Sequence, residues 1–94
     1  MKKIRLSNVA REDLIRIHHY GVNQFGRVQA DKSYFAFFDH FERIAQNPNL
    51  FELVDYIKPG YRRCVCGSDS IYFRVNGKFV EIMTIIGRQN HFFT

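Results

Sequence analysis

Apolar and polar positions follow two different periods along this chain. Between residues 9 and 46, apolar side chains recur at helical spacing. Before residue 7 and after residue 60 they alternate or form short runs, which is typical of strands. The pattern therefore predicts one strand, two helices and then three further strands.

The first strand is predicted over residues 3–6, where Lys and Arg alternate with Ile and Leu. Ser7 or Asn8 offers a side-chain oxygen that can cap the helix that follows. This helix is expected to run toward Phe25. Gly26 is expected to end it in the left-handed conformation that glycine adopts readily.

The second helix is predicted over residues 28–46, and Pro48 is expected to terminate it. Its apolar stripe falls at the i, i+3, i+4 and i+7 positions of one helical face. The stripe consists of Tyr34, Phe37, Phe38, Phe41, Ile44 and Ala45. A short connection between the helices implies an antiparallel pair whose shared apolar face packs on a sheet.

Three strands are predicted over residues 61–66, 70–75 and 78–86. The segment Gly67-Ser68-Asp69 is expected to turn the chain between the first two. Asn76-Gly77 predicts a type I′ hairpin turn in which both central residues have positive φ. The last strand is almost entirely apolar, so we expect it to be central in the sheet.

Residues 49–58 are predicted to form a loop or partial turn. Leu50, Phe51, Leu53 and Ile57 are its expected anchors to the core. The whole chain is then one domain, residues 1–94, of the α+β class with the order β-α-α-β-β-β. A helical hairpin packs on one face of a small antiparallel sheet, and the other face is left to the arginines.

The net charge of +5 is distributed unevenly. Residues 1–9 carry three basic groups and no acid, whereas residues 10–55 carry five basic and seven acidic groups. Residues 56–94 carry six basic and two acidic groups. This asymmetry favours an anionic partner on the sheet side, such as nucleic acid, the ribosome or an acidic peptide. Ordinary solubility charge is the alternative.

Cys64 and Cys66 lie two positions apart, too far along a strand for an unstrained disulfide. They also lack the Cys-x-x-Cys spacing of a metal site. We expect buried thiols in a reducing compartment, with no metal and no cofactor. The sequence contains neither a signal peptide nor an apolar run that could span a bilayer, so a cytoplasmic location without membrane contact is predicted.

Short motifs along the whole chain resemble the ParE branch of the ParE and RelE toxin superfamily. The most specific block is residues 57–62, Ile-Lys-Pro-Gly-Tyr-Arg, followed by residues 71–74, Ile-Tyr-Phe-Arg. Phe25-Gly26 and Asn47-Pro48 match the expected ends of the two helices. The chain departs from many relatives at Gly67-Ser68-Asp69, where they carry basic residues, and in its C-terminal segment.

The resemblance implies a RelE-like toxin fold and a toxin of a type II toxin–antitoxin system. Such a toxin inhibits DNA gyrase by binding it and not by catalysis. Its cognate antitoxin wraps it with a C-terminal segment and binds operator DNA with its N-terminal part. The toxin would therefore meet operator DNA only indirectly, within a higher-order toxin–antitoxin hetero-oligomer.

Candidate site residues follow from exposed aromatic positions, the arginines and the family's C-terminal region. The expected antitoxin contacts are Tyr20, Phe25, Phe35, Arg62, Arg63 and Arg74. The expected target contacts are Arg88, Gln89, His91, Phe92 and Phe93. For Arg62 and Arg74 the alternative is a structural role, such as pairing with Glu81 or Asp69.

Two other functions remain open on the sequence alone. One is a ribosome-dependent mRNA endoribonuclease of the RelE type. Its proton donors and phosphate-stabilising cations would come from Arg62, Arg74, Arg88 and His91. The other is a degenerate, non-toxic protein that only binds its antitoxin.

Overall fold

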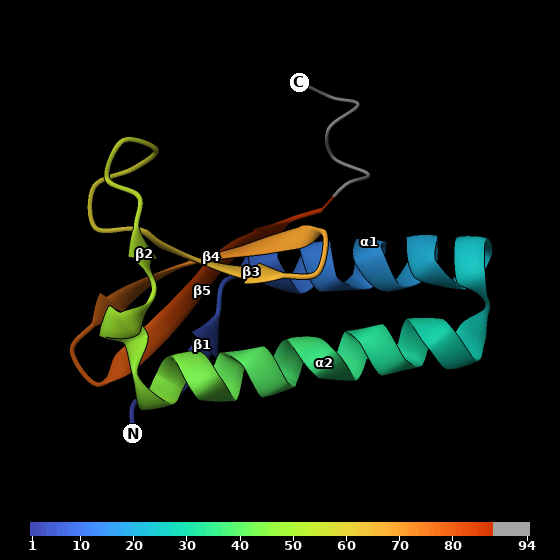
Figure 1. Cartoon of the computed structure of the whole chain (residues 1–94), viewed down its shortest axis with the longest axis horizontal. Coiled ribbons are helices and arrows are strands. Elements are labelled where there is room, and N and C mark those ends of the chain that lie inside the picture. Colours follow the sequence, from blue (N-terminus) through green and yellow to red (C-terminus); the bar gives the residue numbers. More distant parts are fainter. Residues whose placement is uncertain (88–94) are drawn as a thin grey trace.

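Two antiparallel helices lie against one face of a five-stranded sheet (Figure 1). The structure is a computed structural model, and it describes residues 1–87. The helices are α1 (Asn8–Phe25) and α2 (Arg27–Gln46), and a short 3-10 turn, η1 (Pro48–Leu50), follows them. The strands are β1 (Lys3–Leu6), β2 (Glu52–Leu53), β3 (Arg62–Cys66), β4 (Asp69–Asn76) and β5 (Phe79–Ile86). The predicted α+β class with a helical hairpin on the sheet is confirmed.

The strand order is β1-β5-β4-β3-β2, so β5 lies inside the sheet, between β1 and β4, although β4 occupies its middle position. The sheet is mixed, however, because β1 pairs with β5 in parallel, with Ile4 opposite Val80. The prediction of a purely antiparallel sheet was therefore wrong for this pair. A parallel pair needs a long crossover, and here both helices and three strands separate the partners. Hydrophobic periodicity carries no information about strand direction.

The helices begin and end within one residue of the predicted positions, but Gly26 does not have the predicted backbone conformation. Ser7 caps α1, since its Oγ accepts a hydrogen bond from the Ala10 N–H at 3.0 Å. Gly26 has the expected positive φ of 87°, but its ψ of 165° is extended and not left-handed helical. It ends α1 and at once precedes α2 at Arg27, one residue before the predicted start. The extended glycine thus makes a very short hairpin connection.

The core lies between the helical hairpin and the covered face of the sheet. From the predicted stripe, Phe37, Phe41, Ile44 and Ala45 are buried, while Tyr34 is half-buried and Phe38 is partly exposed. Phe37, Phe41 and Ile44 pack with Ala10 and Leu14 of α1 against apolar residues of the sheet, namely Cys64, Ile71, Phe73, Val80, Ile82 and Ile85. Each large apolar side chain buried here contributes about 1.5–3 kcal/mol to stability.

The segment after α2 is anchored differently from the prediction. Leu50 is 80% exposed, and Leu53 and Ile57 are also exposed, so three of the four expected anchors were wrong. Phe51 does pack on the core, edge-to-face with Phe73 at 5.8 Å between ring centroids. Val54 is fully buried and supplies the second anchor. The two residues of β2 were too few to give a strand signal, and their edge position leaves both side chains exposed.

Both β-hairpins form as predicted, but the turn at Asn76-Gly77 differs in register. Asn76 pairs with Phe79, so the loop consists of Gly77 and Lys78. Gly77 has a φ of 59°, whereas no residue other than glycine among residues 1–87 has positive φ. The predicted type I′ turn on Asn-Gly was therefore wrong. Glycine at the first loop position, with positive φ, is the signature of a type II′ turn.

The C-terminal half of β5 pairs with β4 on one side but has no strand on the other, because β1 pairs with β5 only as far as Ile82. Helix α1 supplies the missing partners. The Asp13 carboxylate accepts hydrogen bonds from the Ile85 N–H at 2.9 Å and the Thr84 hydroxyl at 2.7 Å. The Ser7 hydroxyl donates to the Met83 carbonyl at 2.7 Å. These side chains continue the hydrogen bonding of the sheet onto the helix.

Asp13→Ala should lower the free energy of unfolding by about 1–3 kcal/mol, because it leaves the buried Ile85 N–H without an acceptor. Urea denaturation of the purified chain measures this change. Glu12→Ala is the matched control, since Glu12 is an exposed acid on the same turn of α1. Equal loss in both variants would show that helix charge, and not the bond to β5, carries the effect.

Candidate functional site

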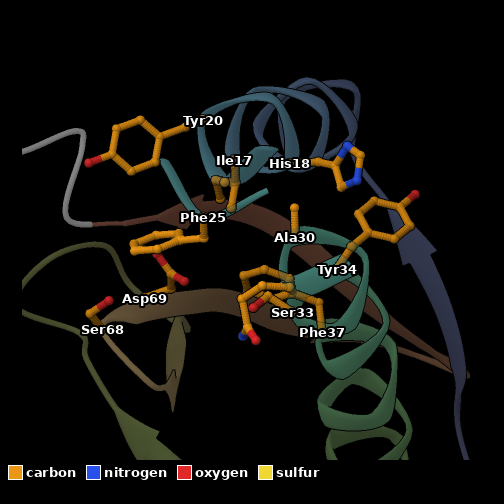
Figure 2. Close-up of a pocket in the computed structure, with 12 residues that line it drawn as sticks. Ile17, His18, Tyr20, Phe25, Ala30, Ser33, Tyr34, Phe37, Ser68 and Asp69 are labelled. Atoms are coloured by element: carbon orange, nitrogen blue, oxygen red, sulfur yellow. The ribbon is translucent and has the colours of Figure 1, made fainter. Parts of the chain in front are cut away.

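A cavity of about 210 Å³ opens beside the helical hairpin, where the two helices meet the β3–β4 turn (Figure 2). Neither helix is apolar enough along its length to cross a membrane. The cavity is open at the surface of the hairpin. It is lined by Ile17, His18, Tyr20, Gly21 and Phe25 of α1, Gln29, Ala30, Ser33, Tyr34 and Phe37 of α2, and Ser68 and Asp69.

Small residues bring the two helices together beside this cavity. A Cβ atom built on Gly21 would lie only 3.3 Å from the Cβ of Ala30. Two larger side chains nearby remain at the surface, since Tyr20 and Phe25 are 38% and 69% exposed. Figure 2 shows Phe25 between α1 and the β3–β4 turn, and Tyr20 projecting outward from α1. The result is an apolar opening with aromatic rims.

Phe35 does not line this cavity, although the sequence grouped it with Tyr20 and Phe25. It is 64% exposed and borders a second depression together with Ile15, His19 and Asp31. His18 and Tyr34 line both depressions. The expected aromatic contacts are thus divided between two neighbouring depressions of the same hairpin.

His18 and Tyr34 form a cross-link between the helices. His18 Nε2 lies 2.7 Å from Asp31 Oδ1, which joins α1 to α2. The His18 ring also packs edge-on against Tyr34, with 5.4 Å between centroids. The His18 side chain is half-buried. Its partner could not be found from the sequence because Asp31 is thirteen positions away on the other helix.

Arg62 has a structural contact on the helix-facing side of the sheet. It stands opposite the fully buried Phe73 across β3 and β4. Its Nη1 donates a hydrogen bond to the Phe51 carbonyl at 2.7 Å. Arg62 therefore fixes the segment whose Phe51 ring covers Phe73, which is the structural role that the sequence left as an alternative.

Arg74 lies on the opposite, uncovered face, paired with Glu81 as the sequence proposed. Arg74 Nε donates to Glu81 Oε1 at 2.7 Å, and Arg5 Nη1 approaches Glu81 Oε2 at 3.2 Å. The hydrogen bond from Arg74 is the main cause that lowers the pKa of Glu81, and the bond from Arg5 adds to it. The Arg5 guanidinium also stacks on the Phe79 ring at 3.7 Å. Sequence reasoning missed Arg5, because only the parallel β1–β5 register places it beside Glu81.

Arg63 lies on the same uncovered face, one strand further along. Its Nη2 is 3.0 Å from Glu52 Oε1 on β2. A hydrogen bond with Tyr72, followed by attraction to Glu52, raises the pKa of Arg63. Each of the three described arginines singled out from the sequence therefore has a partner within the protein.

The residues named for a ribonuclease do not come together among residues 1–87. Arg62 faces the helices, and Arg74 points away from them because it follows the inward-facing Phe73. Arg88 and His91 lie outside the described residues, as do Gln89, Phe92 and Phe93. The described part of the predicted catalytic set is thus divided between two faces of the sheet.

The thiols beside α2 have little nucleophilic character. Both cysteines are free. Burial raises the pKa of Cys64, and burial is also the main cause that raises the pKa of Cys66 to about 11. His40 Nδ1 lies 3.8 Å from Cys64 Sγ, and burial lowers the pKa of His40. Neutral thiols beside a neutral imidazole fit a packed interior. Within residues 1–87, no three His, Cys, Asp or Glu side chains are grouped to hold a metal ion.

Comparison with known proteins agrees with this architecture. Residues 4–92 match the family of the ParE toxin of the type II toxin–antitoxin system parDE. Toxin ParE1 of Caulobacter vibrioides is 35% identical over 86 residues, covering 92% of this chain and 88% of that protein. Toxin ParE1 of Mycobacterium tuberculosis is 34% identical over 74 residues, covering 78% of this chain and 74% of that protein.

Two solved structures share the fold. The chromosomal ParDE toxin–antitoxin system from P. aeruginosa contains a chain that superposes with a TM-score of 0.82 at 25% identity, covering 93% of this chain and 96% of that one. The toxin–antitoxin complex RelBE2 from Mycobacterium tuberculosis gives a TM-score of 0.59 at 21% identity, covering 93% and 98%. The second match shows a shared fold alone. The match to the family over almost the whole chain shows that this protein belongs to the ParE toxins of type II toxin–antitoxin systems.

Proposed function

We propose that this toxin inhibits DNA gyrase by binding it and is neutralised by a cognate antitoxin. Family membership supports this proposal, since the chain belongs to the ParE toxins. The observation that favours binding over catalysis is that Arg62 and Arg74 lie on opposite faces of the sheet. Metal-free RNA cleavage needs a cation and a proton donor at one phosphate, which two arginines on opposite faces do not provide.

The antitoxin is proposed to occupy the cavity of the helical hairpin. An exposed apolar opening of this kind is suited to an amphipathic helix that inserts large apolar side chains. Tyr20 and Phe25 stand at its rim, and Phe35 borders the adjoining depression. One helical segment that lies along the hairpin would reach both depressions, because His18 and Tyr34 are common to them. The antitoxin and toxin would assemble into a hetero-oligomer.

Arg62, Arg63 and Arg74 remain proposed antitoxin contacts of lesser weight. Arg63 and Arg74 keep 32% and 46% of their side chains exposed, so their guanidinium groups are accessible. Each already has a carboxylate partner, Glu52 or Glu81, with which an antitoxin carboxylate would compete. Arg62 would contribute indirectly, because its hydrogen bond to the Phe51 carbonyl holds that segment in place. It would not itself pair with an antitoxin carboxylate.

A supercoiling assay with purified gyrase and the full chain tests the target. We expect inhibition, and we expect added antitoxin to relieve it. Absence of inhibition by folded protein that binds its antitoxin would contradict the proposal. Cleavage of mRNA on ribosomes would then indicate the RelE-type reaction, and loss of both activities would indicate a degenerate toxin.

Phe25→Ala and Tyr20→Ala should each weaken antitoxin binding about 10- to 100-fold, because exposed aromatic anchors carry much of the energy of such interfaces. Isothermal titration calorimetry with the purified antitoxin measures the affinity. Val28→Ala is the matched control, since Val28 is 84% exposed near the hairpin junction but does not line the cavity. An equal effect of Val28→Ala would place the antitoxin elsewhere on the hairpin.

Deletion of residues 91–94 should abolish gyrase inhibition and leave antitoxin affinity nearly unchanged. The reason is that Arg88, Gln89, His91, Phe92 and Phe93 are the proposed target contacts, whereas the cavity lies at the hairpin. The supercoiling assay and calorimetry on the same preparation measure the two properties. A parallel loss of both would show that these residues belong to the fold.

A further inference from the structure

A second surface, which we name the strand-end patch, gathers basic residues where β1 begins and β4 turns into β5. It consists of Lys2, Lys3, Arg5, Arg74 and Lys78. The Lys3 N–H donates to the Lys78 carbonyl at 2.9 Å, so these two residues are neighbours across the strands. Lys2 Nζ donates to the Gly77 carbonyl at 2.8 Å, within the same turn. Figure 1 shows this end of the sheet beside the N-terminus, away from the hairpin junction.

The patch concentrates positive charge. A depression between the three lysines of the patch and the end of α2 is lined by Lys2, Lys3 and Lys78 and, within residues 1–87, by no acidic residue. Arg5 and Arg74 share the Glu81 carboxylate, whose side chain is only 12% exposed beneath them. With Glu81 included, the patch has a formal charge of +4, against +5 for the whole chain. Almost all of the net charge of the protein therefore resides at one end of the sheet.

The chemistry of the patch fits the phosphates of a duplex better than a single strand. Proteins that bind single strands offer open aromatic faces on which bases stack. Here the Phe79 ring is covered by the Arg5 guanidinium at 3.7 Å. The three lysines are compact charges on flexible stems, which suits contact with a regular array of phosphates but gives no fixed geometry for reading bases.

We propose that the strand-end patch binds the phosphate backbone of duplex DNA without reading its sequence. The patch is distinct from the proposed antitoxin cavity, since none of its five residues lines that cavity. Arg74 alone also belongs to the arginines proposed as lesser antitoxin contacts. Binding of this kind leaves recognition of the operator sequence to the antitoxin. The patch adds a direct electrostatic contact between the toxin and DNA to the indirect one expected through the antitoxin.

Fluorescence anisotropy of a short labelled DNA duplex, titrated with the full chain alone, tests the proposal. We expect a dissociation constant of about 10⁻⁴ to 10⁻⁶ M at physiological salt. The logarithm of the binding constant should fall linearly with the logarithm of salt concentration between about 50 and 200 mM. Lys3→Gln combined with Lys78→Gln should weaken binding about tenfold or more and make the salt slope shallower by about two.

Arg27→Gln combined with Lys32→Gln is the control, because it removes two exposed charges from the hairpin and leaves the patch intact. Urea denaturation should show that both double variants are folded. The proposal is overturned if the two variants lose affinity equally, if the duplex does not bind, or if single-stranded RNA of the same length binds more tightly. Preference for an acidic peptide over the duplex would also overturn it. Because neither gyrase nor antitoxin is present, failure here is distinct from failure of the proposed function.

Discussion

The parallel pairing of β1 with β5 is the contact on which the rest of the fold depends. It joins residues 3–6 to residues 79–82, near opposite ends of the chain. Where the strand pairing stops, Ser7 and Asp13 continue the hydrogen bonding from α1 to the remainder of β5. The helix is therefore fixed to β5 by polar bonds as well as by apolar packing. This attachment determines where the helical hairpin lies on the sheet.

The geometry of the sheet separates the two surfaces that carry the proposed interactions. The hairpin cavity includes the β3–β4 turn, whereas the strand-end patch includes the β4–β5 turn. These turns lie at opposite ends of the eight residues of β4, which corresponds to roughly 26 Å of strand. The two proposed partners, one apolar at the hairpin cavity and one anionic at the strand ends, would consequently not compete for the same site. On the uncovered face, ion pairs with Glu81 hold Arg5 and Arg74 of the patch in place, and an ion pair with Glu52 holds Arg63.

The sequence predicted the elements well because their signals are local. The helical stripe, the Ser7 cap and the apolar β5 each depend on neighbouring residues. The features that it could not predict depend on residues far apart in the chain, such as the Arg5–Glu81 pair and the burial of Val54 in place of Leu53. The same holds for the candidate site: Tyr20 and Phe25 were found as exposed aromatics, but their separation from Phe35 required the packing of both helices.

The position of β5 has a consequence for the synthesis of the protein. Because β5 follows every other described strand in the sequence, β1 and β4 have no partner between them until residue 86 has been translated. A domain of this topology folds as a unit, so nascent or prematurely terminated copies lack the sheet that supports the hairpin. Copies that stop before β5 would therefore lack both the support for the hairpin cavity and the β4–β5 turn, and they would be open to proteolysis.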